Sequence, residues 1–313
     1  MAQVKIGVVG SGAVGTYFGA RLALAGAEVR FLMRGDLAAV RSRNRITVHD
    51  HLGRAELSPV AAFDAPQEIG PVDVVLVGLK TTSSRAARDL IEPLLGPSTA
   101  ILTLQNGLGA DEFLGSLFGA SRILGGIVFM AINRMGPGEV RVFDRGSVTL
   151  GEWAGGPTER VRALVDLFER AALGPRLVED LQEARWRKLV WNIPFNGLSI
   201  AEGGVATDRI CSDPRLAAEA RALMHEVQAA AAGFGYTIPD AFIQRQFEVT
   251  PPMGAYRPSS LVDFLAGREV EVESIWGEPL RRARGRGVAM PRLEALHARL
   301  VSLCAGPRPG VPG

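Results

Sequence analysis

Residues 4–15 read VKIGVVGSGAVG, and this stretch decides the fold of the chain. Its first seven residues are mostly apolar and rich in β-branched side chains, which is typical of a buried parallel strand. A glycine-rich turn with the spacing GxGxxG follows, and residues 13–26, AVGTYFGARLALAG, have a helical pattern. The three glycines allow a tight turn, a close approach of backbone to phosphate, and tight packing of helix on strand. Strand, turn and helix together predict a dinucleotide-binding unit.

The predicted cofactor site begins with this turn, because the start of the helix offers free N–H groups and a positive dipole to phosphates. The turn residues are Gly10, Ser11, Gly12, Ala13, Val14 and Gly15. About 20 residues further on, an acidic residue would bind the ribose hydroxyls of NAD. The chain has Met33-Arg34-Gly35 there, and Arg34 can pair with a 2′-phosphate, which favours NADPH. We assign Asp36, two residues later, to the cap of the next helix.

The remaining pattern divides the chain into two domains. Strands are predicted at 27–34, 72–79, 99–106, 122–131, 139–143, 147–151 and 176–179, with helices at 83–95 and 158–172. This alternation predicts a doubly wound, Rossmann-type α/β domain over residues 1–180. Segments 182–200, 214–233 and 259–276 have helical patterns, so residues 181–305 form an all-helical domain. Within the last segment, REVEVES alternates like a strand but is taken as helix, and residues 306–313, GPRPGVPG, are predicted to be a disordered tail.

Composition narrows the class of protein. A chain of 313 residues exceeds what one core usually serves, and its net charge of +2 argues against a nucleic-acid or membrane-surface partner. No apolar run approaches the roughly 18–20 residues that span a bilayer, and we find no secretion signal. Cys211 and Cys304 lack a CxxC spacing or a histidine partner, so no disulfide framework or metal site is predicted. We expect a cytoplasmic protein; the oligomeric state, a homodimer included, stays open.

The chain contains three lysines and thirty-two arginines. Arginine and lysine exchange readily on a solvated face, so a sequence with this bias tends to keep lysine where an ammonium is needed as a proton donor. Lys80 ends the strand over 72–79, and Asn106, in Gln105-Asn106-Gly107, ends the next strand at the same edge of the sheet. Ligands of an open α/β sheet bind at this edge, so both side chains are predicted to line the crevice.

A second polar group lies in KLVWNIPFN, residues 188–196. Lys188, Asn192 and Asn196 are spaced four residues apart, so on a helix they share one face, while the residues between them are apolar. Such a polar stripe is predicted to face a ligand or solvent. Pro194 removes one helical hydrogen bond, so we expect a kink there.

These motifs resemble the ketopantoate reductase (2-dehydropantoate 2-reductase) family. The glycine-rich loop, Lys80, QNG, KLxxN with a second Asn four residues on, and a late Pro-Ser…Asp…Gly-Arg…Glu run match its order and spacing from residue 4 to about 280. The resemblance implies NADPH-dependent reduction of a small 2-oxo acid, ketopantoate to pantoate, in pantothenate biosynthesis. It makes Lys188 the general acid, supported by Glu271. Lys80 and Asn106 are assigned to the cofactor site by their place at the sheet edge. It assigns Asn106, Asn192, Asn196 and Ser259 to the substrate, and Arg34 to the 2′-phosphate.

Some positions depart from the family pattern. The family usually reads Pro-Leu-Thr-Ala where this chain has Gly197-Leu198-Ser199-Ile200, the family's next Asn has no counterpart in AEGGVATDRI, and Ser260 replaces a usual Met. We interpret these positions as lying around the non-reacting end of the substrate, which leaves another branched or bulky 2-oxo acid as an alternative. Ser260 with Asp263 fits a capping box for a helix over 261–267, which leaves Ser259 as the ligand candidate.

Two further functions remain as alternatives. A β-hydroxyacid dehydrogenase of the 6-phosphogluconate type also has a Lys-x-x-x-Asn pair, but it carries a glycine-rich turn before the lysine, where this chain has EARWR over 183–187. A non-catalytic NADPH sensor would keep the fold without needing Lys188 and Glu271 together. The retained pair therefore favours an enzyme.

Overall fold

The computed structural model of the chain describes residues 3–306. The predicted disordered tail over 306–313 lies, apart from Gly306, outside the described residues. The chain divides into two compact units. The first comprises the described residues up to Gln105 together with Ala110–Leu181, and the second comprises Asn106–Gly109 and the described residues from Gln182 onward. The segment Asn106–Gly109 thus belongs to the second unit, whereas the sequence analysis assigned it to the first.

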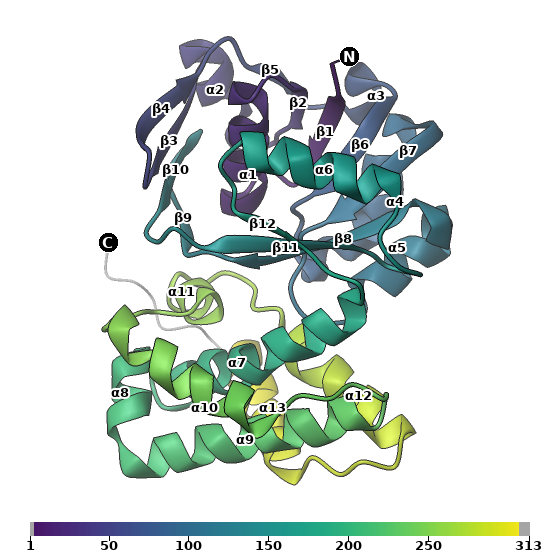
Figure 1. Ribbon diagram of the computed structural model, residues 1–313. Helices are drawn as coiled ribbons and strands as arrows, with labels where there is room; N and C mark the ends of the chain where they lie inside the picture. Colours follow the sequence, from purple (N-terminus) through teal and green to yellow (C-terminus); the bar gives the residue numbers. More distant parts are fainter. Residues whose placement is uncertain (1–2, 307–313) are drawn as a thin grey trace. The chain divides into compact units, whose positions relative to one another are not determined.

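The first unit, within the described residues, is built on an eight-stranded sheet of order β12-β11-β8-β7-β6-β1-β2-β5 (Figure 1). Its strands are β1 (Lys5–Val9), β2 (Glu28–Leu32), β5 (Ala61–Phe63), β6 (Val72–Val77), β7 (Leu95–Thr103), β8 (Ile123–Phe129), β11 (Ser147–Glu152) and β12 (Pro175–Leu177). Neighbouring strands pair in parallel except for β8 and β11, which are antiparallel. The predicted doubly wound α/β fold is confirmed.

Helices cover both faces of this sheet because its central strands are apolar on both sides. In β6, Val74 and Leu76 join the core that contains α1 and α6, while Val75 and Val77 join the core that contains α4 and α5. Successive residues of a strand point to opposite faces, so one apolar run supplies both cores. The helices are α1 (Ala13–Leu24), α2 (Leu37–Arg43), α3 (Pro66–Ile69), α4 (Ala87–Ile91), α5 (Ala110–Phe118) and α6 (Glu159–Arg170).

A second sheet of order β4-β3-β10-β9 completes the first unit. Its strands are β3 (Ile46–Asp50), β4 (Gly53–Leu57), β9 (Ile132–Gly136) and β10 (Glu139–Val142). Helix α1 contacts strands of both sheets, which explains why Gly15–Leu22 are buried around the whole helix. Of these four strands only β10 was predicted. Strands β4 and β9 are polar and carry no apolar alternation. Strand β3 alternates the buried Ile46 and Val48 with polar residues and was overlooked.

A buried ion pair joins α1 to the second sheet. The Asp50 carboxylate at the end of β3 accepts hydrogen bonds from Arg21 Nε at 2.7 Å, from Arg21 Nη2, and from the Tyr17 hydroxyl at 3.2 Å. The Asp50 side chain is fully buried. Burial alone would raise the pKa of Asp50, but the hydrogen bonds from Arg21 and from the Leu52 N–H, with the Arg21 charge, hold it below its usual range. Asp50 is therefore ionised, and the pair holds the two layers together.

The second unit is helical, as predicted. Its helices are α7 (Leu181–Ala201), α8 (Thr207–Ser212), α9 (Pro214–Ala232), α10 (Asp240–Val249), α11 (Ser259–Leu265), α12 (Glu278–Gly285) and α13 (Pro291–Ala305), with a π-helical turn at Glu273–Gly277 (Figure 1). Trp186, Phe195 and Trp276 are fully buried in its core. Helix α7 continues through Pro194 without interruption. Across residues 3–306, we find no helix that is both long and apolar enough to cross a membrane.

Three local predictions were wrong. The helix expected at 83–95 is α4 flanked by two 3₁₀ turns, Thr81–Ala86 and Glu92–Leu94, because Pro93 cannot donate the next helical hydrogen bond. The helix expected over 259–276 stops after Leu265, where Gly267 adopts a left-handed φ of +66°. Ser260 does not cap α11, which begins one residue earlier with Pro258 at the cap position and no side-chain capping bond.

The Arg21–Asp50 pair gives a stability prediction. Asp50→Asn leaves the buried Arg21 guanidinium without a counter-charge, so the free energy of unfolding should fall by about 3–5 kcal/mol. Asp64→Asn is the matched control, since Asp64 forms an exposed pair with Arg41 at 3.7 Å and should change stability by less than about 1 kcal/mol. Urea unfolding followed by circular dichroism measures both, and equal effects of the two substitutions would contradict the prediction.

Candidate functional site

A pocket of about 280 Å³ lies in the first unit at the carboxyl ends of β1, β2 and β6. Of the predicted cofactor residues, it is lined by Gly10, Ser11, Gly12, Arg34 and Lys80. The other lining residues are Leu32, Met33, Gly35, Asp36, Asp64, Gly78, Leu79 and Leu90. Ala13, Val14 and Gly15 belong to the adjoining first turn of α1 rather than to the lining. The edge of an open α/β sheet is where such folds bind ligands.

The three glycines of the turn differ in whether a side chain would fit at their positions, and why. Gly10 adopts a φ of +95°, and a Cβ on it would overlap the backbone of Leu79. A Cβ on Gly15 would overlap the carbonyl oxygen of Gly10. Gly12 has open space where its Cβ would point, and it occupies the cap position of α1 without a side-chain capping bond. The first N–H groups of α1 therefore remain available at an uncrowded backbone, which fits a dinucleotide pyrophosphate.

Ser11 has a structural task in the same turn. Its hydroxyl donates a hydrogen bond to the Leu32 carbonyl at 2.7 Å, and its own carbonyl accepts one from the Thr16 hydroxyl at 3.0 Å. These bonds fix the glycine-rich turn against the end of β2, two residues before Arg34. The turn and the residue expected to select the cofactor are thereby held in one geometry.

Arg34 and Asp36 differ in whether their side chains have hydrogen-bond or ion-pair partners. The Arg34 side chain is exposed at the pocket, and among residues 3–306 its guanidinium has no hydrogen-bond or ion-pair partner. Asp36 occupies the cap position of α2 as predicted, but its carboxylate makes no capping bond. Arg134 and the Gly138 N–H bind both of its oxygens instead. The sequence analysis missed Arg134, which lies 98 residues away along the chain.

In the second unit, Lys188 and Asn106 come together although they are 82 residues apart in the sequence. The Lys188 ammonium donates a hydrogen bond to Asn106 Oδ1 at 2.6 Å. The segment that carries Asn106 is fixed by the Leu108 N–H, which donates to the Ser274 carbonyl at 2.9 Å. A Cβ on Gly107 would overlap that same carbonyl, so only glycine allows this close approach. The Asn106–Gly109 segment is thus docked on the π-helical turn within the second unit.

The surroundings of Lys188 shift its protonation. Burial of the ammonium is the main cause that lowers the pKa of Lys188 to about 7, and the positive charge of Arg185 lowers it further, while the charge of Glu271 opposes both. Arg185 is buried one helical turn before Lys188, on the same side of α7. Sequence analysis did not single out Arg185; its i−3 spacing from Lys188 was the available signal. A lysine with this pKa can release its proton near neutral pH.

Glu271 is buried in the segment just before the π-helical turn. Its backbone carbonyl accepts hydrogen bonds from the Ile275 N–H at 3.2 Å and from the Ser274 hydroxyl at 3.3 Å. Trp276, in the same turn, donates from its indole N–H to the Ile193 carbonyl of α7 at 3.0 Å. These bonds fix the main chain on which Glu271 stands, so its charge stays near Lys188.

Asn192 and Asn196 are both buried on α7. Asn196 Oδ1 accepts a hydrogen bond from the Ser260 N–H at 3.0 Å, so this amide holds the start of α11. Ser259, the first residue of α11, is exposed beside it. The structure therefore brings together Lys188 with Asn106 and Asn196 with the Ser259–Ser260 turn. It gives Asn196 a positioning contact that the sequence did not predict.

Three of the four departures at residues 197–200 lie in the packed core of the second unit. Gly197 lies about 180° around α7 from Lys188, and a Cβ on it would stand 2.7 Å from Leu296 Cδ2 and 2.9 Å from Trp276 Nε1. Leu198 and Ile200 are buried in the core of the second unit. Gly197, Leu198 and Ile200 therefore reflect how α7 packs in the core of the second unit. Ser199 differs, because it lies about 20° around α7 from Lys188 and its buried hydroxyl has no hydrogen-bond partner among residues 3–306. For Ser199, a place near the non-reacting end of the substrate stays a prediction.

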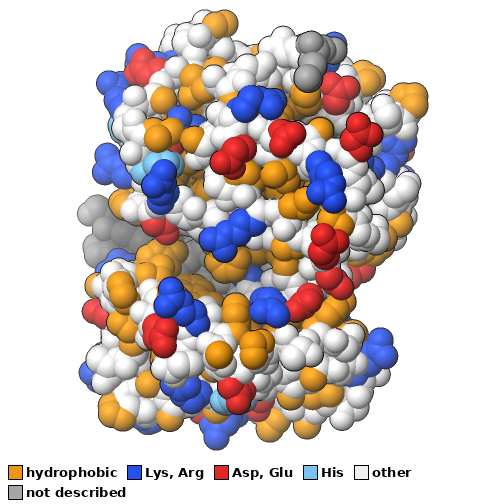
Figure 2. Space-filling view, in the orientation of Figure 1, with side chains coloured by type: hydrophobic (Ala, Val, Ile, Leu, Met, Phe, Trp, Pro, Cys, Tyr) orange, Lys and Arg blue, Asp and Glu red, His pale blue; other side chains and the backbone are white. Residues whose placement is uncertain are grey.

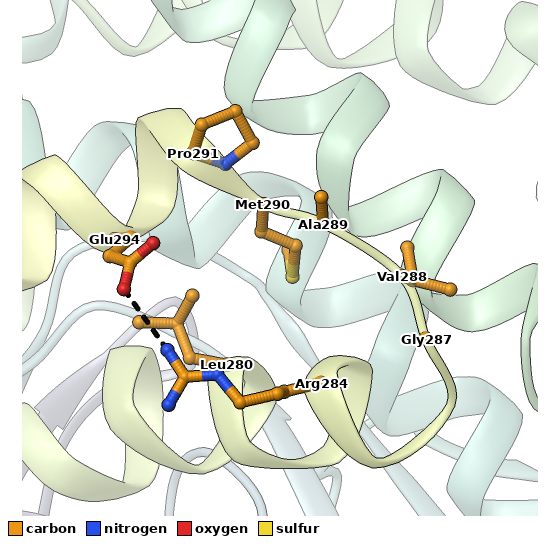
Figure 3. Close-up of a pocket in the computed structure, with 8 residues that line it drawn as sticks. All are labelled: Leu280, Arg284, Gly287, Val288, Ala289, Met290, Pro291 and Glu294. Atoms are coloured by element: carbon orange, nitrogen blue, oxygen red, sulfur yellow. Dashed lines mark hydrogen bonds and ion pairs between the residues drawn. The ribbon is translucent and has the colours of Figure 1, made fainter.

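A second pocket, of about 310 Å³, lies between α12 and α13 in the second unit (Figure 3). Its floor is apolar, from Leu280, Val288 and Met290, and its polar rim is an exposed ion pair between Arg284 and Glu294 at 3.0 Å. None of the predicted site residues lines it.

Figure 2 shows cationic and anionic side chains interleaved over the visible face, in keeping with the net charge of +2.

Comparisons with known proteins extend this picture. Residues 6–155 match the family described as ketopantoate reductase PanE/ApbA, and residues 180–302 match the C-terminal part of that family. The chain is 36% identical to the 2-dehydropantoate 2-reductase of Nostoc sp., over 99% of this chain and 98% of that protein. The corresponding protein of Mesorhizobium japonicum is 30% identical, over 87% of this chain and 89% of the relative.

Solved structures agree with the sequence relatives. The crystal structure of 2-dehydropantoate 2-reductase from Geobacter metallireducens superposes with a TM-score of 0.93 at 42% identity, covering 96% of this chain and 99% of that one. The enzyme from Methylococcus capsulatus gives a TM-score of 0.88 at 32% identity, covering 96% of each chain. Fold and comparisons together define an oxidoreductase with a Rossmann-type unit and a helical unit. The chain belongs to the ketopantoate reductase family.

The burial of Lys188 and the nearby charge of Arg185 predict the pH at which this lysine loses its proton. Because burial and Arg185 lower the pKa to about 7, the ammonium should be present below pH 7 and lost as the pH rises through that value. With three lysines in the chain, carbon-13 labelling gives three side-chain signals, and Lys188→Arg identifies the one that disappears. Its chemical shift, followed by NMR from pH 5 to 11, should have a midpoint near 7. A midpoint near 10.4, the ordinary value for lysine, would contradict the prediction.

Proposed function

We propose that the chain reduces ketopantoate to pantoate with NADPH as the hydride donor. The observation that carries this proposal is the Lys188 ammonium, held by Asn106 at 2.6 Å in surroundings that bring its pKa to about 7. The relatives are 2-dehydropantoate 2-reductases, which supports ketopantoate as the substrate. Lys188 and Glu271 are the proposed catalytic residues, and Asn106, Asn192, Asn196 and Ser259 the proposed substrate site.

The division of labour follows from the chemistry. Bound NADPH supplies a hydride to the carbonyl carbon of the 2-oxo acid. Negative charge then develops on the carbonyl oxygen, which a nearby ammonium stabilises. Lys188 Nζ gives its proton to that oxygen, so the carbonyl becomes a hydroxyl and the lysine becomes neutral. Glu271, by favouring the charged form of Lys188, supports recovery of the proton before the next turnover.

The proposed cofactor site is the pocket of the first unit. The free N–H groups at the start of α1, at the open backbone of Gly12, would hold the pyrophosphate. The exposed guanidinium of Arg34 would pair with the 2′-phosphate, and Lys80 adds a second cation to the lining. Both oxygens of Asp36 are engaged by Arg134 and Gly138, so this acid is not available to a ribose hydroxyl.

Loss of the proton donor gives the first functional prediction. A positioned general acid contributes about 10²–10⁴-fold, so Lys188→Ala should lower kcat with ketopantoate by at least about a hundredfold while NADPH affinity stays nearly unchanged. Lys188→Arg should restore little, because a guanidinium keeps the charge but does not release a proton near pH 7. Arg187→Ala is the matched control, since Arg187 is a neighbour on α7 whose guanidinium pairs with Glu183 at 2.7 Å.

Glu271→Ala should also lower kcat, but little further in the Lys188→Ala background if both residues act as one unit. Steady-state NADPH oxidation over a panel of 2-oxo acids measures the five variants. Near-normal turnover of Lys188→Ala would remove this residue from the chemistry. Absence of activity of the wild type with every 2-oxo acid would reject the reductase function itself.

Cofactor selectivity gives the second functional prediction. NADPH should bind at least tenfold more tightly than NADH, a difference of about 1.4 kcal/mol that charge-assisted pairing with a phosphate readily supplies. Arg34→Ala should remove most of this preference by weakening NADPH alone. Fluorescence titration of both cofactors decides the point. Equal affinities in the wild type, or an unchanged preference in Arg34→Ala, would refute the assignment.

A further inference from the structure

Just after β2, two side chains that favour different cofactors line the same pocket. Arg34 and Asp36 both line it, two residues apart. A cation at this place attracts the 2′-phosphate of NADPH, whereas a carboxylate attracts the ribose hydroxyls of NAD and repels a phosphate. The Asp36 side chain keeps 13% of its surface exposed, so it stands at the edge of the pocket rather than deep in the core. The preference of the pocket for NADPH or NAD therefore depends on which of these two side chains acts on the ribose and its 2′-phosphate.

The β9–β10 hairpin binds the Asp36 carboxylate through hydrogen bonds. From β9, Arg134 donates from Nε to Asp36 Oδ2 at 3.1 Å and from Nη2 to Asp36 Oδ1. From the turn of the hairpin, the Gly138 N–H donates to Asp36 Oδ2 at 3.1 Å. A planar guanidinium that binds both carboxylate oxygens is a strong and well-oriented pair. Asp36 therefore has its charge balanced and both oxygens occupied.

We propose that Arg134 is a residue that determines cofactor specificity, acting through Asp36: by holding this carboxylate on the hairpin, it lets Arg34 alone set the preference for the 2′-phosphate. The inference rests on the proposed NADPH preference and extends it to a residue outside the pocket lining. Arg134 belongs to the second sheet, on an edge strand that the cofactor-binding motif does not include. The second acid of the lining, Asp64, forms only a looser and exposed ion pair with Arg41 at 3.7 Å.

The decisive variants are Arg134→Gln, Asp36→Asn and their combination. Arg134→Gln removes the cation that balances Asp36 and leaves only the Gly138 N–H bound to this carboxylate beside Arg34, so NADPH should bind about tenfold more weakly and NADH several-fold more tightly. In the double variant the side chain at position 36 is an uncharged amide, so the ratio of the two affinities should return close to that of the wild type. Arg141→Gln is the matched control, because Arg141 is an exposed arginine of the same hairpin, on β10, that has no bond to Asp36.

Dissociation constants of NADPH and NADH, measured by fluorescence titration of the full chain, test the proposal. A fall of at least tenfold in the NADPH-to-NADH affinity ratio in Arg134→Gln, reversed by Asp36→Asn and absent in Arg141→Gln, would support it. A fall that persists in the double variant would overturn it, since Arg134 would then contact the phosphate directly. An unchanged ratio in Arg134→Gln, with both cofactors still bound, would overturn it as well.

This design separates the inference from the proposed function. The wild-type ratio alone tests the NADPH preference. Tighter NADH binding in Arg134→Gln depends only on the release of Asp36, and it is measurable whichever cofactor the wild type prefers. NADH binding by each variant also shows that the first unit remains folded, so a loss of structure cannot be mistaken for a change in specificity.

Discussion

The first unit depends on the close approach of α1 to the ends of β1 and β6. Three glycines meet there: a Cβ on Gly78 would stand 2.7 Å from the Gly10 carbonyl oxygen and 3.1 Å from Gly15 Cα, and a Cβ on Gly15 would overlap that same oxygen. Side chains at these positions would push the helix away from the sheet. Because the helix lies so close, its free N–H groups open into the pocket that Arg34 and Lys80 line.

The second unit obtains its polar site by docking three segments on one helix. The segment Asn106–Gly109 supplies the partner of Lys188, and the start of α11 is held by Asn196. The segment that carries Glu271 leads into the π-helical turn, which binds α7 through Trp276. A π-helical turn widens the helix locally and is often found at functional sites. Each docking contact is a hydrogen bond to backbone or amide, so the geometry around Lys188 is set by the main chain as much as by side chains.

The parts of this molecule that the sequence predicted are those with strong local signals. The β1–turn–α1 unit follows from an apolar run and three glycines, and the stripe of α7 follows from a four-residue spacing. Such signals do not reveal partners that are distant in the sequence. The hydrogen bond from Lys188 to Asn106, the Arg134–Asp36 pair and the burial of Gly197 against Leu296 each join residues that only the tertiary fold brings together.

Local rules also misled where a tertiary contact took precedence. Asp36 stands at a helix cap position, yet its carboxylate turns to a guanidinium because a charge-assisted pair outweighs a capping bond. Ser260 fits a capping box in the sequence, but its N–H is bound by the Asn196 side chain and α11 starts earlier. Strands β4 and β9 of the second sheet were not predicted because they are polar and have no apolar alternation, and none of their residues is fully buried.

The arginines and Lys188 of this chain have different electrostatic roles. Arginine cannot lose its proton at physiological pH, so it serves as a permanent counter-charge, as Arg21 does for Asp50, Arg134 for Asp36 and Arg160 for Glu152. At Lys188 the same physics works in the opposite direction. Burial and the neighbouring charge of Arg185 disfavour the ammonium, and the group approaches a state in which it can give up its proton. An arginine at this place would remain charged and could not donate. A chain in which nearly every cation is arginine thus retains a lysine at the position where the proposed reaction needs an exchangeable proton.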